Sequence, residues 1–567
     1  MTDSNIDRRA LLKGVIGSAT ALASTSVVGC GASADSPGEN VGDAVEPIAL
    51  GPLDPVARAD AAFDVRVDAA KQQRAFPIPP HPTNGDEKRY PTKFANYSKA
   101  LPHDEVGNVD LAAYATLIAA LESGRFEDFE RVILGGTRPL TDPMSAYAFL
   151  LQGGDSHDFF VPPAPRFASA EQQSEAAEDY WMALLRDVPF NEYDESPLAR
   201  AAIADLNRFS DFRGPKINGK VTPQTLFRWK APGTLVGPYV SQFLVHDVPY
   251  GAQPFAQRNV TRVPGDNRLT DFDEWLAVQN GTRDVVPAVY DPVRRYMRDG
   301  RDLAEYVHIC QLIQDAYNAA MIIGGFGATP GNPFSPETAG LNPVLLDEGN
   351  PYKQSVKQTG FGTFGAPDVY DRLARSIVPA LKAVFFQKWL VHRRLRPEEY
   401  GGTVQATLTG TESFPIGDEL LSSPVLKAVL KKYGTYLLPQ AYPEGSPTHP
   451  SYPAAHATFI GASATMVKAF FDENFVIPDP MVVSDDGLSL CPYKGKPLTI
   501  GGELNKLAMD VAFARNLAGV HWRSDSEQGL YLGEAVAIRI MKDLKLLYAE
   551  PFRGFTFTTF SGQKITV

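Results

Sequence analysis

Apolar residues recur three to four positions apart along much of this chain, which is the spacing of one face of an α-helix. The clearest case is residues 303–322, where one stripe consists of Val307, Cys310, Ile313, Tyr317 and Met321. A second long helix is expected from about Asp368 to Arg394. These patterns predict a mainly α-helical protein.

The starts of two further helices are marked by residues that satisfy free backbone N–H groups. Ser169 and Gln172 form a capping box ahead of an apolar run, and Ser196 precedes Pro197 at the start of another. Alternation typical of strands is sparse. It is clearest in FTFTTFSGQKITV at the C-terminus, where a turn at Ser561-Gly562 predicts one small β-hairpin.

Composition limits the classes of partner. The 567 residues are 44% hydrophobic and carry a formal net charge of -12. This balance is that of a globular protein and argues against a general nucleic-acid binder. Any anion site must therefore be a local cationic pocket.

The first 30 residues have the features of an export signal. Arg8-Arg9 precede a small, apolar run that ends in Val27-Val28-Gly29-Cys30. The paired arginines resemble a Tat signal, and the final four residues resemble a lipobox, which implies cleavage before Cys30 and lipid attachment to its sulfur. A Tat signal cut elsewhere is the alternative. We expect residues 31–50 to be a flexible tether, 51–567 to form one helical domain, and the mature protein to be periplasmic or extracellular.

The first segment that could form a cationic pocket is KWLVHRRLRP, in which Lys388 and Arg396 lie eight positions apart. On a continuous helix they would be about 80° apart, on neighbouring faces. Pro397 disfavours α geometry at Arg396, so we expect this arginine where the helix gives way. A solvated basic helix face is the alternative interpretation.

Histidines follow in a proline-rich stretch, PEGSPTHPSYPAAHATFIGA, which contains His449 and His456. Pro453 is a suitable first residue for a helix, and this places His456 in the first turn. Free N–H groups and the positive end of the helix dipole make such a turn an anion site. Alone, His456 could equally be a capping or core residue.

A third segment contains Arg515, Gly519 and His521. Arg515 and His521 would be about 240° apart on an unbroken helix, but Gly519 can end the helix and let both face one point. Together the three segments supply a lysine, two arginines, a helix N-terminus and two histidines. That set suits a tetrahedral oxyanion, with fixed cations around it and a histidine to move a proton.

The three segments resemble, in order, the motifs shared by vanadium-dependent haloperoxidases and the type 2 phosphatidic acid phosphatases. The residues that match these motifs are Lys388 with Arg396-Pro397, Pro453-Ala-Ala-His456, and Arg515-x-x-x-Gly519-x-His521. All three motifs lie within residues 385–525. The residues around them are similar to those of the bromoperoxidase branch of the family. The resemblance implies two four-helix bundles in one domain.

The resemblance also implies vanadate as the cofactor. His521 would be the axial vanadium ligand and His456 the acid–base residue. The equatorial oxygens would be held by Lys388, Arg396, Arg515 and the backbone N–H of Ala455. His449 and Phe385 would line a halide pocket. A carboxylate should orient one histidine, for which Asp315 is the candidate and Asp525 the rival.

The implied activity is oxidation of bromide, and also of iodide, by hydrogen peroxide to a hypohalous acid that halogenates small organic substrates. A homo-oligomer is expected. One alternative is an acid phosphatase of the same superfamily, with a phosphohistidine at His521; another is a non-catalytic oxyanion-binding lipoprotein. The family's usual Pro-Ser-Gly-His is here Pro-Ala-Ala-His, so Ala454 and Ala455 depart from the pattern.

Overall fold

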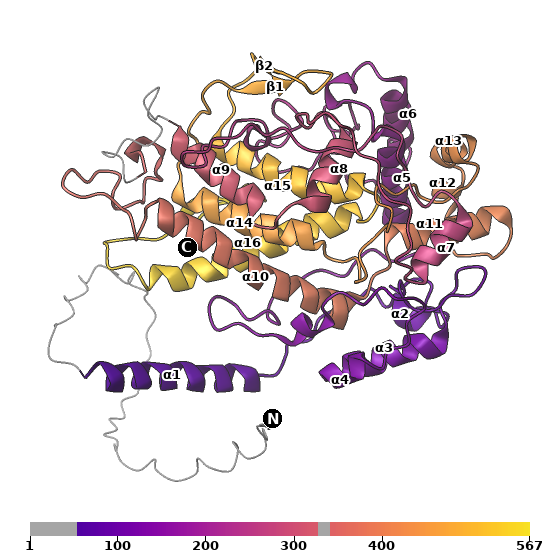
Figure 1. The fold of residues 1–567 in the computed structure, drawn as a ribbon, viewed down its shortest axis with the longest axis horizontal. Coiled ribbons are helices and arrows are strands. Elements are labelled where there is room, and N and C mark those ends of the chain that lie inside the picture. The colour runs from indigo at the N-terminus through magenta and orange to yellow at the C-terminus, as the bar shows by residue number, and fades with distance from the viewer. Residues whose placement is uncertain (1–53, 327–340) are drawn as a thin grey trace, which may run out of the picture. The chain divides into compact units, whose positions relative to one another are not determined.

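Four long helices of the C-terminal half form the bundle that carries the site (Figure 1). They are α10 (Ala366–Phe386), α14 (Ala455–Phe470), α15 (Ile500–Leu517) and α16 (Arg523–Lys545). The central helix is α14, which contacts the other three and is buried along nearly its whole length. The computed structural model describes residues 54–326 and 341–567.

Glycines allow α14 and α16 to pack closely. A Cβ atom added at Gly533 would lie 2.1 Å from the carbonyl oxygen of Thr458, and one at Gly461 would lie 2.6 Å from that of Leu530. Both distances are far inside van der Waals contact, so no larger residue fits without a shift of a helix. The first turns of α14 and α16 are thereby held near each other, and both belong to the candidate site.

A second group of helices packs around α5 (Ala170–Leu185). Its other members are α6 (Pro197–Leu206), α11 (Pro397–Thr409), α12 (Asp418–Leu421) and α13 (Pro424–Tyr433). Both predicted N-caps are confirmed, because Ser169 Oγ accepts from the Gln172 N–H at 3.1 Å and Ser196 Oγ from the Ala199 N–H at 3.3 Å. The reciprocal half of the predicted capping box is absent, because Gln172 Oε1 accepts from Arg394 at 2.7 Å. The mainly α-helical fold is therefore as predicted.

The remaining elements are short or lie toward the N-terminus of the described part. The helices are α1 (Pro55–Ala75), α2 (Asp86–Arg89), α3 (Leu111–Ser123), α4 (Phe126–Phe129) and α7 (Phe272–Gln279). Single 3₁₀ turns are η1 (Pro143–Tyr147), η2 (Phe190–Glu192), η3 (Gln242–Leu244) and η5 (Pro343–Leu345). Among the described residues, no helix is long and apolar enough to cross a membrane.

The predicted C-terminal hairpin is present. Strand β3 (Thr556–Thr558) pairs antiparallel with β4 (Lys564–Thr566), with Phe557 opposite Ile565. A second hairpin, β1 (Met481–Val483) with β2 (Leu490–Pro492), was not predicted. Each of its strands has only three residues, which is too short for an alternating pattern to stand out.

The helix expected over residues 303–322 is broken in two, so that prediction was wrong. Helix α8 (Gly300–Ile309) ends where Cys310 takes an extended conformation, and α9 starts afresh (Gln314–Gly325). The break frees carbonyl groups of the last turn of α8. The Val307 carbonyl is then available to a side chain from another helix, His456.

The helix expected from Asp368 to Arg394 is close to what is found. Helix α10 continues into a π-helical turn, η6 (Gln387–His392), and ends at Arg393, which has a left-handed conformation. Arg396 is extended and directly precedes α11, as the following proline predicted. The predicted export signal and the tether of residues 31–50 lie outside the described residues.

Candidate functional site

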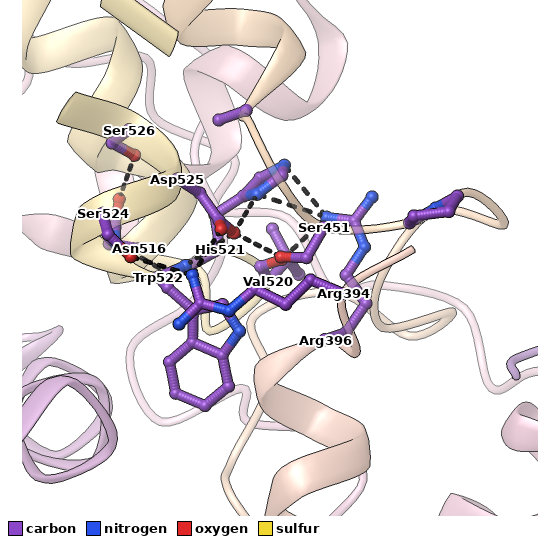
Figure 2. A network of polar contacts seen from close by, with 12 residues as sticks. Arg394, Arg396, Ser451, Asn516, Val520, His521, Trp522, Ser524, Asp525 and Ser526 are labelled. Carbon is purple, nitrogen blue, oxygen red and sulfur yellow. Dashed lines mark hydrogen bonds and ion pairs between the residues drawn. The ribbon is translucent and has the colours of Figure 1, made fainter. Parts of the chain in front are cut away.

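Arg396 brings two of the predicted histidines together in the interior. Its Nη1 donates to His521 Nε2 at 2.9 Å, and its Nη2 donates to His449 Nδ1 at 2.8 Å. The same guanidinium donates to the backbone carbonyls of Val520 and His449. Residues from the loop before α11, the loop before α14 and the loop before α16 thus meet at one point (Figure 2).

Two further cations face this point. The Lys388 Nζ, from η6, donates to the carbonyl oxygens of Pro450 and Ser451 at 2.8 and 2.6 Å. Arg515, near the end of α15, donates to the Tyr442 hydroxyl at 3.2 Å, while its Nε is buried without a partner. Burial, followed by the charges of Arg396, Lys388 and Arg515, holds the pKa of His521 well below its usual range.

The three cations lack a carboxylate partner. In residues 54–326 and 341–567, no ion pair joins Lys388, Arg396 or Arg515 to an acidic side chain, and the nearby Asp525 is paired with Arg394. Burial and the charge of Arg396 hold the pKa of Lys388 well below its usual range, and burial lowers the pKa of Arg396 to about 10. Buried cations without counter-charges are costly, so the arrangement is suited to an anion that supplies the missing negative charge.

A carboxylate orients His521, and it is Asp525. His521 Nδ1 donates to Asp525 Oδ2 at 2.8 Å, in the first turn of α16. The prediction of Asp315 was wrong, because that side chain accepts from the Tyr306 hydroxyl across the break between α8 and α9. Asp525 is the third residue of α16, where it also accepts from the Trp522 N–H at 3.1 Å, so an acidic residue in the first turn of a helix was the sequence signal.

His456 lies in the first turn of its helix, as predicted, although α14 begins at Ala455 and not at Pro453. Its Nε2 donates to the Val307 carbonyl at 3.1 Å. A carbonyl can only accept, so Nε2 carries the proton and Nδ1 of the neutral ring is an acceptor. Burial and the charge of Arg515 hold the pKa of His456 well below its usual range.

The N-terminus of α14 offers unused donors. Ala454 is the N-cap and has no side chain that could accept from the first turn. The N–H groups of Ala455 and His456 cannot reach an acceptor within their own helix, since they are its first two residues. Ala454 itself is fixed by donating its N–H to the Asp525 carbonyl at 2.9 Å.

Phe385 and His449 lie against each other. Their ring centroids are 5.3 Å apart at an angle of 52°, and both side chains are buried. Phe385 belongs to α10, so this contact joins the bundle to the loop that precedes α14. An apolar ring beside a histidine gives this side of the site a less polar wall.

Two residues near Arg515 had no signal in the sequence. The Arg515 guanidinium lies over the Tyr442 ring, 5.1 Å from its centroid, and the His308 ring stacks on Tyr442 at 4.0 Å. His308 Nε2 also pairs with Glu444 at 2.7 Å. Burial opposes protonation of His308, but the carboxylates of Glu305 and Glu444 outweigh it and raise its pKa. Tyr442 lies in a loop without periodicity, so only the folded chain reveals these contacts.

Comparisons with known proteins agree with this geometry. Residues 430–550 match the family model described as the second helical-bundle domain of VCPO. The chain is 36% identical to a vanadium-dependent bromoperoxidase of Ascophyllum nodosum, over 91% of this chain and 93% of that protein. It is 32% identical to a vanadium-dependent bromoperoxidase of Corallina officinalis, over 90% of this chain and 98% of that protein.

The fold is also similar to a solved structure. A homohexameric vanadate-dependent bromoperoxidase from Ascophyllum nodosum superposes with a TM-score of 0.82 at 29% sequence identity. The match covers 94% of each chain. The similarity thus extends well beyond the three motifs.

Proposed function

The chain belongs to the vanadium-dependent bromoperoxidase family, and from this premise we propose that its buried cationic site holds vanadate between Lys388, Arg396, Arg515 and His521. It is an enzyme that oxidises a halide with hydrogen peroxide and uses vanadate as its cofactor.

One observation carries the assignment of the site. Three buried cations have no acidic partner among the described residues. Arg396 donates to His521, and burial together with the charges of Arg396, Lys388 and Arg515 lowers the pKa of that histidine. Vanadate is a tetrahedral oxyanion, which can accept hydrogen bonds from arginine forks, a lysine and free backbone N–H groups at once. The residues present therefore fit the cofactor.

Each histidine can be given a role from its hydrogen bonds. Asp525 occupies Nδ1 of His521, so Nε2 is the atom that would ligate vanadium; in the structure Nε2 accepts from Arg396 Nη1, which would donate to the bound oxyanion instead. His456 stays neutral at neutral pH and presents Nδ1 as an acceptor, so it can take a proton from hydrogen peroxide. Bound vanadate supplies a Lewis acid that activates the peroxide toward attack by a halide.

The halide side is proposed to be formed by His449 and Phe385. We expect bromide and iodide as substrates, with hypohalous acid as the product that halogenates small organic molecules. The methyl groups of Ala454 and Ala455 replace the family's hydroxyl and glycine at the first turn of α14. They remove one hydrogen-bond donor toward the anion and add bulk beside a free N–H.

Assembly and location are further proposals. Because a similar structure is described as homohexameric, we propose that this chain forms a homo-oligomer, which multi-angle light scattering would measure. The residues at 1–30 support export through the Tat route with a lipid anchor at Cys30. Mass spectrometry of the protein purified from its native membranes would detect the lipid.

The assignment is tested by reconstitution. Apoprotein and its His521→Ala variant are titrated with orthovanadate, and bound vanadate and peroxide-dependent bromination are both measured. Wild type should gain bromination only with vanadate, and excess phosphate should suppress it. His521→Ala should lose both signals, whereas His246→Ala, a histidine whose ring packs against Phe326 away from the site, should retain them. Phosphate-ester hydrolysis without bromination would overturn the assignment.

A further inference from the structure

We infer that Arg394, held by Glu175, is a positioning residue for the cofactor: it fixes the Asp525 carboxylate and through it the ring of His521. The inference rests on the proposed role of His521 as the vanadium ligand. Arg394 does not touch the site itself. It lies one layer behind it, between the group of helices around α5 and the first turn of α16.

Both terminal nitrogens of the Arg394 guanidinium form the bridge, while its Nε is buried without a partner. Its Nη1 donates to Asp525 Oδ1 and to Ser524 Oγ, both at 2.8 Å. Its Nη2 donates to Glu175 Oε2 at 2.8 Å and to Gln172 Oε1 at 2.7 Å. The planar fork thus binds one carboxylate on each side, which a lysine ammonium cannot reproduce with the same geometry.

Asp525 is held on its other side by the site. Its Oδ2 accepts from His521 Nδ1, from the Trp522 N–H at 3.1 Å and from the Ser451 hydroxyl (Figure 2). Both oxygens are therefore occupied, and Arg394 is the charged partner of the oxygen that faces away from His521. Loss of this partner would free the carboxylate to rotate, and the imidazole that it orients would rotate with it.

Glu175 completes the link to α5. Its Oε1 accepts from the Ser524 N–H at 2.6 Å, and its Oε2 accepts from Ser524 Oγ at 3.0 Å as well as from Arg394. The chain of contacts Glu175, Arg394, Asp525 and His521 is buried throughout. Buried side chains with several hydrogen-bond partners are restricted to one conformation, so the ring of His521 is fixed before the cofactor binds.

The same junction offers a matched control. Arg523 also joins α5 to the first turn of α16, through Glu178, with Nε donating to Oε2 at 2.7 Å. It is as buried as Arg394 and donates to the Arg228 carbonyl and to Glu527. No contact joins it to Asp525 or to the ring of His521 within the described residues. A change at Arg523 therefore costs an α5–α16 ion pair without releasing the ligand.

The experiment compares Arg394→Gln, Arg394→Lys and Glu175→Gln with Arg523→Gln. The Kd for orthovanadate is measured by equilibrium dialysis, bound vanadate is observed by ⁵¹V NMR, and melting temperatures are recorded without vanadate. For vanadate-saturated enzyme, kcat and the KM for bromide are determined separately. Glu175→Gln keeps the shape of the side chain, so it can still test the inference if a variant at Arg394 does not fold.

We expect Arg394→Gln to raise the Kd for vanadate by about 10–100-fold and to shift or broaden the ⁵¹V signal, with the KM for bromide unchanged. Arg394→Lys and Glu175→Gln should give smaller increases. Arg523→Gln should lower the melting temperature and leave Kd within about twofold of wild type. Unchanged Kd in the variants at Arg394 and Glu175, or an equal increase in Arg523→Gln, would overturn the inference. Failure of wild type to bind vanadate would instead overturn the proposed function.

Discussion

Ala454 is the single residue at which this site departs most clearly from its family. As the N-cap of α14 it has no side-chain acceptor for the first turn, and its methyl group is fully buried. A serine hydroxyl there can accept from a free N–H of the helix and can also donate to an oxyanion. The alanine therefore lowers both the stability of the helix start and the number of donors to the cofactor.

We expect Ala454→Ser to tighten vanadate binding. One added hydrogen bond to a charged group contributes about 1–2 kcal/mol, which corresponds to roughly a 5–30-fold lower Kd. Titration of apoprotein with orthovanadate measures it. An unchanged Kd together with a lower melting temperature would mean that the hydroxyl only strains the packing against α16.

Protonation at the site gives a second prediction at the scale of residues. Burial, with the neighbouring cations, lowers the pKa of His449, His456 and His521 from the usual 6.5. The unfolded chain therefore takes up protons at a higher pH than the folded chain, so stability is highest above pH 6.5 and falls as the pH drops toward the lower folded values.

Urea unfolding of vanadate-free protein at several pH values checks this sign. The free energy of unfolding should decrease steadily below pH 6.5, and the triple replacement of these histidines by glutamine should flatten that decrease. His308 has the opposite shift and is left intact in the comparison. Stability that rises on acidification would contradict the assignment of three neutral histidines.

At the scale of elements, the sequence predicted those features that depend on residues close together in the chain. The caps at Ser169 and Ser196 and the extended Arg396 before Pro397 follow from contacts within a few residues, and all three are found. The break at Cys310 was missed because the Val307 carbonyl that it frees finds its partner far along the chain. That carbonyl accepts from His456, nearly 150 positions later. Apolar periodicity continues through the break and cannot reveal it.

The same distinction explains the site. Lys388, Arg396, His456, Arg515 and His521 could be chosen because their motifs are local. The orienting carboxylate depends on where helices begin: Asp525 is in the first turn of α16, whereas Asp315 lies in the first turn of α9 beside Tyr306. Arg394 and Glu175 lie more than 200 positions apart, so no local pattern joins them.

Close packing of α14 against α16 is the element-level feature most open to test. Gly533→Ala would place a methyl group 2.1 Å from the Thr458 carbonyl oxygen, so the two helices must separate. We expect a loss of about 1–3 kcal/mol in the free energy of unfolding, measured by urea denaturation, with weaker vanadate binding. Gly362→Ala, at an exposed position with no atom within 4 Å, is the control and should change neither.

At the scale of the whole molecule, we expect bound vanadate to stabilise the folded protein. The site draws residues from η6, α14 and α15 and from the loops before α11 and α16, so a ligand that joins them opposes unfolding of the entire bundle. The chain carries a net charge of -12, yet this interior is cationic, so a bound oxyanion removes local repulsion among Lys388, Arg396 and Arg515. Stabilisation by vanadate should thus exceed any effect of ionic strength on the surface.

Linkage sets the size of this effect. Free vanadate at roughly 100 times its Kd should add about 2.7 kcal/mol to the free energy of unfolding, provided that it binds only the folded chain. Thermal or urea unfolding with increasing orthovanadate should give a logarithmic rise in stability, which phosphate reproduces at higher concentration and chloride at equal ionic strength does not. His521→Ala should abolish the response, and Lys388→Met should weaken it by removing one of the three cations. A rise of equal size in both variants and wild type would show that the anion acts elsewhere on the molecule, because only binding at this site depends on these two side chains.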